Sequence, residues 1–72
     1  MKEGSMSTAR LEDLPADISE ALKAAPAAGA RFVALPPSHR GEYLRWIAEA
    51  KKPPTRARRI AHMVRRLGEE AP

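Results

Sequence analysis

The residues of this chain with the clearest chemical potential are basic, and they gather in its C-terminal third. No acidic residue occurs between Glu49 and Glu69. We predict that this segment carries an interaction surface made of Lys51, Lys52, Arg56, Arg58, Arg59, His62, Arg65 and Arg66. Such a surface can follow a phosphate backbone or contact another protein. A solvated basic face without any partner is the plain alternative.

Arg56 and Arg59 allow two interpretations that the sequence does not separate. A guanidinium group can hold phosphate oxygens in a bidentate manner. The same side chains can instead form ion pairs with Glu42 or Glu49 in the preceding helix. Both interpretations stay open at this stage.

Two aromatic residues, Tyr43 and Trp46, could form a stacking platform for bases beside these arginines. Their helical spacing with Ile47 and Ala50 favours a place in the hydrophobic core instead. We therefore assign Trp46 to packing.

No combination of residues suggests catalysis. His39 and His62 are far apart in the sequence and the chain has no cysteine, so we predict no metal site. Ser38 beside His39 is explained as a helix cap, because adjacent residues of a helix do not face each other. Phosphate-binding glycine loops and other catalytic motifs are absent from the sequence. We expect no catalytic residue, no cofactor and no enzymatic activity.

Proline residues divide the chain into helical segments. The first helix starts near residue 14, with Asp17 favourable at the positive end of its dipole, and must end or break at Pro26. Pro26 can also open a short alanine-rich second helix, which Gly29 weakens. The pair at 36–37 then interrupts the backbone.

The last two helices show the clearest patterns. Ser38 is predicted to cap the third helix, which runs to about Ala50. After the break at residues 51–54, Thr55 caps or begins the fourth helix and Gly68 ends it. Apolar residues of the fourth helix recur at spacings of three and four: Ala57, Ile60, Ala61, Val64 and Leu67. Because the connection is short, the apolar stripes of the two helices should meet in an antiparallel hairpin.

With 72 residues, 43% apolar and 31% charged, the chain is long enough for one compact domain and too short for two. We predict an all-α fold, a small bundle of about four short helices with a C-terminal antiparallel helical hairpin. The single helical domain should span residues 13–69, after a disordered leader at 1–12 and before a tail at 70–72. A core of this size gives little stability, so self-association or docking on another protein is a further hypothesis.

The sequence contains no apolar run of membrane-spanning length, and residues 1–10 lack the apolar centre of a secretory signal. We therefore expect a cytoplasmic location. The apolar stripe of the last helix is needed for the core, so we do not expect binding to a membrane surface.

Residues 37–51 contain Pro-Ser followed by Arg-x-Glu-Tyr-x-x-Trp-Ile-x-x-Ala-Lys, and residues 55–60 read Thr-Arg-x-x-Arg-Ile. This pattern resembles the bacteriocin-protection family, also described as YdeI or OmpD-associated, and the likeness covers about residues 14–68. The resemblance implies a helical fold, a bacterial source and a link to bacteriocin tolerance and envelope stress. It supplies no catalytic residues to transfer.

Two functional hypotheses follow. The leading one is a non-catalytic interaction module in bacterial stress or envelope tolerance, acting through contacts with a protein that the sequence does not identify. The alternative is a nucleic-acid-binding module whose last helix lays Arg58, Arg59, His62, Arg65 and Arg66 along a phosphate backbone. In the second case the affinity should fall steeply as salt rises.

Overall fold

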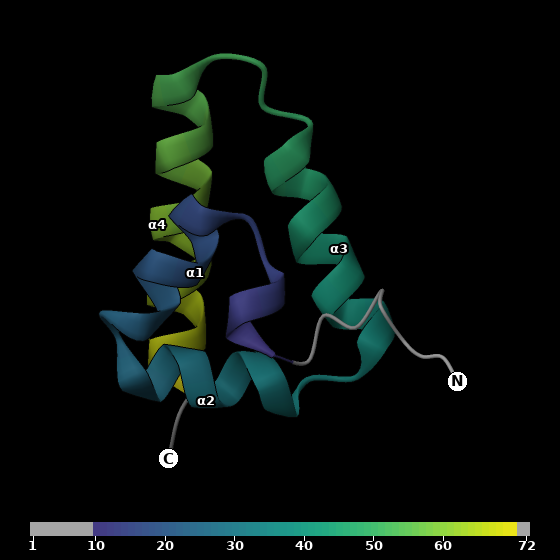
Figure 1. Cartoon of the computed structure of the whole chain (residues 1–72), viewed down its shortest axis with the longest axis vertical. Coiled ribbons are helices and arrows are strands. Elements are labelled where there is room, and N and C mark those ends of the chain that lie inside the picture. Colours follow the sequence, from purple (N-terminus) through teal and green to yellow (C-terminus); the bar gives the residue numbers. More distant parts are fainter. Residues whose placement is uncertain (1–9, 71–72) are drawn as a thin grey trace.

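The computed structural model describes residues 10–70, and this part of the chain contains helices and connecting segments but no strand (Figure 1). A short 3-10 turn, η1 (Leu11–Asp13), precedes four α-helices: α1 (Ala16–Lys23), α2 (Pro26–Ala34), α3 (Pro37–Ala48) and α4 (Pro53–Glu70). The predicted all-α fold is confirmed. The leader predicted at 1–12 includes part of η1, and residues 1–9 lie outside the described part.

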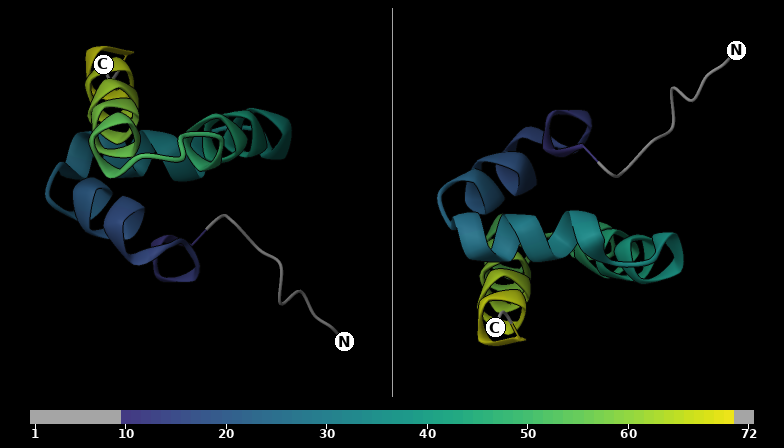
Figure 2. Two further views of the ribbon diagram at one scale, coloured as in Figure 1. Left: turned by 90° about the horizontal axis from the view of Figure 1, so that it is seen from above. Right: turned by 90° about the horizontal axis from the view of Figure 1, so that it is seen from below.

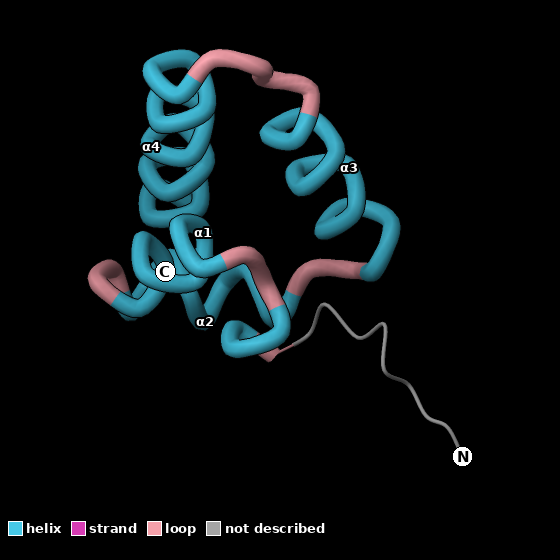
Figure 3. The backbone as a smooth tube through the Cα atoms, turned by 45° about the horizontal axis from the view of Figure 1, so that its top comes forward, coloured by secondary structure: helices cyan, strands magenta, loops and turns pink. Residues whose placement is uncertain are grey.

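The helices are arranged around the hairpin that the sequence predicts. α3 and α4 run antiparallel, and α2 lies across the ends at which α3 begins and α4 finishes (Figure 1). Seen from below, α2 reaches from α4 to α3 (Figure 2). Short connections join the helices (Figure 3). α4 nevertheless makes its most extensive contacts with α2 rather than with α3, so the core is not simply the inner face of a hairpin.

Proline sets the start of three helices. Pro26 and Pro37 lie in the first turns of α2 and α3, and α4 begins at Pro53. Proline suits this position because its φ is already helical and it has no amide hydrogen left without a partner. The predicted cap at Ser38 is wrong, since α3 begins one residue earlier and no side chain caps it. Thr55 neither caps nor begins α4, because the helix starts at Pro53 and Thr55 lies within its first turn.

Two helix ends differ from the sequence-based expectation. Gly68 does not end α4, which continues to Glu70. No glycine of the described part has a positive φ, and a glycine stop depends on that left-handed conformation. α3 ends at Ala48, two residues before the predicted end, and the amide of Ala50 donates to the carbonyl oxygen of Ile47, three residues back, instead of continuing the α-helical pattern.

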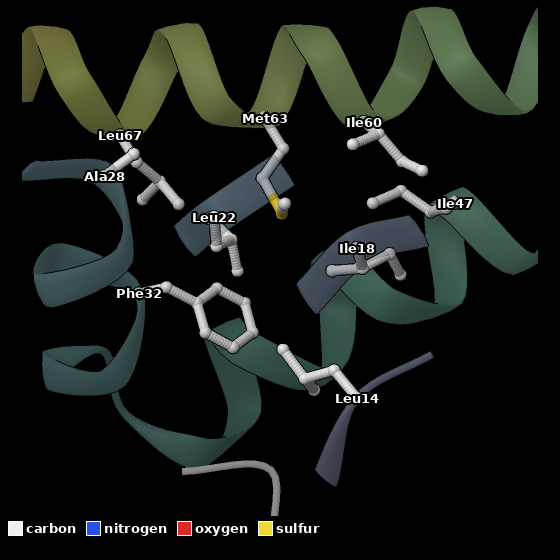
Figure 4. Packing of buried hydrophobic residues seen from close by; sticks show 9 residues of the cluster. All are labelled: Leu14, Ile18, Leu22, Ala28, Phe32, Ile47, Ile60, Met63 and Leu67. Atoms are coloured by element: carbon white, nitrogen blue, oxygen red, sulfur yellow. The ribbon is translucent and has the colours of Figure 1, made fainter. Parts of the chain in front are cut away.

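All four α-helices contribute to one hydrophobic core. Its buried side chains, shown in Figure 4, are Leu14, Ile18, Leu22, Ala28, Phe32, Ile47, Ile60, Met63 and Leu67. Phe32 is completely buried, and Met63 and Leu67 of α4 are too. Figure 4 shows the ring of Phe32 below Leu22, with α4 running along the opposite side of the cluster.

The buried face of α4 is rotated relative to the predicted stripe. Ile60 and Leu67 are buried as expected, but Ala57 and Ala61 are exposed and Met63 takes their place in the core. Ile60 and Leu67 can share a helix face either with Ala57 and Ala61 or with Met63, because these two faces overlap. The structure buries the face that contains Met63. The larger Met63 side chain gains more from burial than an alanine does.

Gly29 and Arg40 each allow or stabilise a close contact between neighbouring segments. A Cβ atom on Gly29 would lie 2.9 Å from the carbonyl oxygen of Leu22, so glycine permits α2 to pack closely against α1. Arg40 is only 9% exposed, and its Nη1 donates a hydrogen bond to the carbonyl oxygen of Leu35. This bond closes the connection between α2 and α3.

Candidate functional site

The structure divides the predicted interaction surface into two groups. The exposed residues are Lys51, Lys52, Arg58, Arg65 and Arg66. The half-buried residues are Arg56, Arg59 and His62, and each of them contacts a residue of another helix. The basic segment is therefore not one uniform face, and part of it serves the fold.

Arg56 forms an ion pair with Asp17 of α1, which is not one of its predicted partners. Its Nε lies 2.6 Å from Oδ2 of Asp17, and its Nη2 lies 3.1 Å from Oδ1 of the same carboxylate. The hydrogen bond from Arg56 holds the pKa of Asp17 below its usual value and raises the pKa of Arg56. Among the acids of the described part, Arg56 pairs with Asp17 of α1 rather than with Glu42 or Glu49 of the preceding helix and its end.

Arg59 joins α4 to α3 through Trp46. Its Nη1 donates a 2.6 Å hydrogen bond to the carbonyl oxygen of Trp46. The guanidinium carbon also lies 5.1 Å from the centroid of the Trp46 ring, within the range of a cation–π contact. In the structure the guanidinium of Arg59 contacts Trp46 rather than Glu42 or Glu49, the two acids considered as its partners.

His62 supports the same tryptophan from α4. The rings of His62 and Trp46 have centroids 5.4 Å apart and planes inclined at 67°. Trp46 is half-buried and packs against the hydrophobic core, which agrees with its predicted packing role. Its position is thus fixed by the core and by two residues of α4.

Next to Trp46 the surface is hollowed into an open groove of about 540 Å³ between α2, α3 and α4. Its lining residues are Arg31, Leu35, His39, Glu42, Tyr43, Trp46, His62 and Arg66. We call this the aromatic groove. All its lining residues except Leu35, which directly follows α2, lie in helices that share one core, so its shape follows from the packing of these helices.

The aromatic groove combines positive charge with apolar surface. Arg31 and Arg66 reach it from α2 and α4, and Glu42 is the acidic residue in its lining. Leu35, Tyr43 and Trp46 are half-buried and provide its apolar walls. A groove of this composition can accept an anionic group beside an apolar one.

A comparison with known protein families gives one match that spans the whole helical part of the chain. A family model described as bacteriocin-protection, YdeI or OmpD-associated matches residues 13–70. The chain belongs to this family. The resemblance seen in the sequence is confirmed, and the match to the bacteriocin-protection family spans every residue that lines the aromatic groove. Searches of curated proteins and of solved structures each found no match.

Six residues of the groove were not part of the predicted surface: Arg31, Leu35, His39, Glu42, Tyr43 and Trp46. A sequence signal for the groove exists in the last two helices of this family member. His39, Glu42 and Trp46 follow one another at spacings of three and four, and Arg59, His62 and Arg66 do the same. Residues at these spacings share a helix face, so two neighbouring helices each present a polar and aromatic stripe. The contribution of α2 has no such signal.

A second hollow of about 550 Å³ lies on the other flank of α4. Its apolar lining is made of small and medium-sized residues, among them Ala21, Ala57, Ala61 and Val64. Its polar groups are the Asp17–Arg56 pair, already bonded to each other, and Arg65. This flank offers less for recognition than the aromatic groove does.

Among residues 10–70, no group of three His, Cys, Asp or Glu side chains is placed to hold a metal ion. His39 and His62 both line the aromatic groove although they are distant in the sequence. None of the helices in the described part combines the length and apolar character needed to cross a membrane.

Proposed function

We propose that this member of the bacteriocin-protection family is a non-catalytic interaction module that acts in the cytoplasm by binding another protein, in a bacterial stress or envelope-tolerance response. The observation that carries the proposal is the aromatic groove, which joins basic and apolar surface on a fixed helical frame. Protein interfaces are enriched in tryptophan, tyrosine and arginine, and all three line this groove. Its non-catalytic character is supported by the lack of cysteine and of catalytic motifs in the sequence.

A nucleic-acid-binding module is the second candidate, and the exposed arginines of α4 favour it. Arg58 and Arg65 are seven residues apart, so they share one face of the helix. Lys51 and Lys52 add positive charge in the connection before α4. Phosphate binding was one of two interpretations for Arg56 and Arg59. In the structure these side chains bond to Asp17 and Trp46. The basic surface for this candidate is smaller than the sequence suggests.

Binding titrations separate the two candidates. Labelled duplex and single-stranded DNA and RNA are titrated with the full chain at low and high salt, and also with an Arg58→Ala/Arg65→Ala variant. For a protein-binding module we expect weak binding that is unchanged in the variant. Micromolar binding at low salt that fades as salt rises, and that the variant loses, would reject the proposal in favour of nucleic acid.

Purification from native bacterial cells supplies the positive arm. The tagged chain is recovered after nuclease treatment, and bound proteins are identified by mass spectrometry. We expect one protein in near-stoichiometric amount with the wild type and with the Arg58→Ala/Arg65→Ala variant. Recovery that nuclease abolishes would contradict a protein contact.

A further inference from the structure

We propose that the aromatic groove binds an acidic peptide segment of a partner protein, with a carboxylate against Arg31 and an apolar side chain against its apolar wall. This inference rests on the proposed function, because it takes the partner to be a protein. It goes further by naming the site and the chemistry of the segment that occupies it.

The charges of the groove favour separate carboxylates over a continuous polyanion. Arg31 on α2 lines the groove and is exposed, and a guanidinium can bind a carboxylate through two parallel hydrogen bonds. Glu42 lies in the same lining and repels negative charge placed near it. A peptide can place an acidic residue at Arg31 and leave the surroundings of Glu42 neutral, whereas every phosphate of a nucleic acid is charged.

The apolar wall is ready to receive a side chain. Leu35, Tyr43 and Trp46 keep part of their surface exposed while packing against the core. Arg59 and His62 hold Trp46 from α4, so its ring does not have to be ordered when a ligand binds. A wall that is fixed in advance saves the entropy that ordering would cost.

The contacts of Trp46 also argue against base stacking. The guanidinium of Arg59 lies 5.1 Å from the centre of the indole ring and occupies a stacking position. A base would have to displace this contact or use the remaining surface, which faces His62 and the groove. An apolar peptide side chain needs only contact with the exposed part of the ring.

The chain contains a single tryptophan, and it lies in the groove, so its fluorescence reports on occupancy directly. The full chain is titrated with a short glutamate-rich peptide that carries leucines. The same peptide with serine in place of leucine, a lysine-for-glutamate version and an oligothymidylate serve as comparison ligands. Arg31→Ala is the test variant and Arg58→Ala the matched control, because both remove one positive charge from an exposed position and Arg58 does not line the groove.

We expect a saturable change in Trp46 emission with the leucine-containing acidic peptide. Its Kd should rise about tenfold in Arg31→Ala and less than about twofold in Arg58→Ala, since a charge-assisted pair lost from a site is worth about a factor of ten. The serine peptide should bind about tenfold more weakly, because it lacks the apolar contact. The basic peptide should not bind. Circular dichroism should show that both variants keep the helical content of the wild type.

Several results would overturn the inference: unchanged Trp46 emission, equal weakening by both arginine variants, or equal binding of the serine peptide. Binding of oligothymidylate with the same dependence on Arg31 would assign the groove to nucleic acid and reject the proposed function as well. If the peptide fails while the nucleic-acid titrations show only weak binding unchanged in the Arg58→Ala/Arg65→Ala variant, the groove assignment is wrong and the proposed function stands.

Discussion

Gly29 and Gly68 both lie inside helices, but their surroundings place opposite demands on them. A Cβ on Gly29 would meet the backbone oxygen of Leu22 at 2.9 Å, whereas nothing lies within 4 Å of a Cβ on Gly68. We predict that Gly29→Ala lowers the free energy of unfolding by about 1–3 kcal/mol, because α1 and α2 must move apart. Gly68→Ala should instead raise it by up to about 1 kcal/mol, through better helix propensity. Urea denaturation followed by circular dichroism measures both, and equal effects would contradict the close approach.

At the residue scale, sequence patterns predicted the general role of a residue better than they predicted which residue it contacts. Trp46 was correctly assigned to packing from its helical spacing. Arg56 was recognised as a residue with two possible partners, and the structure bonds it to a third, Asp17. The two are 39 residues apart in the chain, so local spacing carries no information about their contact. The carbonyl oxygen of Trp46, which receives the Arg59 bond, is a backbone atom that no sequence pattern marks.

At the scale of elements, the Asp17–Arg56 pair links the start of α1 to the start of α4. The side chains are 48% and 28% exposed, so solvent screens their attraction and the pair should contribute about 0.2–1 kcal/mol. The pKa of Asp17 is lowered in the folded chain by the Arg56 hydrogen bond. This contribution is therefore complete above the pKa of an unfolded aspartate, about 4, and is lost as the pH falls through the lower folded pKa.

A double-mutant cycle tests this link. The free energy of unfolding is measured for the wild type, Asp17→Asn, Arg56→Gln and the double variant at neutral pH and in acid. We expect a coupling of about 0.2–1 kcal/mol at neutral pH that shrinks once the pH drops below about 4. A parallel cycle with Arg58→Gln in place of Arg56→Gln should give no coupling. A coupling that persists unchanged in strong acid would show that the charges are not its source.

Helix starts were predicted to within about two residues, and helix faces less well. Pro26 was correctly predicted to open α2, whereas Pro37 and Pro53 were assigned to breaks although they begin α3 and α4, where the ring of proline imposes a helical φ. Ser38 and Gly68 were weaker guides, since a cap and a stop each need a particular backbone conformation that neighbouring residues decide. The face of α4 was ambiguous, because Ile60 and Leu67 belong both to the face with Ala57 and to the face with Met63. Only the packing of α2 and α1 against α4 chooses between them.

At the scale of the whole molecule, family membership and helix content follow from the sequence, but the packing order does not. A short connection predicts that α3 and α4 are neighbours, and they are (Figure 1). It does not predict that α2 makes the larger contact with α4. The same arrangement brings Arg31 beside α3 and α4, and of the residues that line the aromatic groove only His62 and Arg66 belonged to the predicted surface.

The size of the core makes the whole molecule sensitive to one buried ring. A domain of this length has a total stability of about 4–11 kcal/mol, and replacing a buried phenylalanine with alanine costs about 3–5 kcal/mol. We predict that Phe32→Ala lowers the urea midpoint strongly and leaves a measurable unfolded fraction in water. The adjacent Val33 is 38% exposed, so Val33→Ala should change the stability by no more than about 0.5 kcal/mol. Because Phe32 belongs to the same cluster against which Trp46 packs, circular dichroism and Trp46 emission should report one common transition. If Phe32→Ala melted α2 while Trp46 emission stayed native, the aromatic groove would not depend on the core as a single unit.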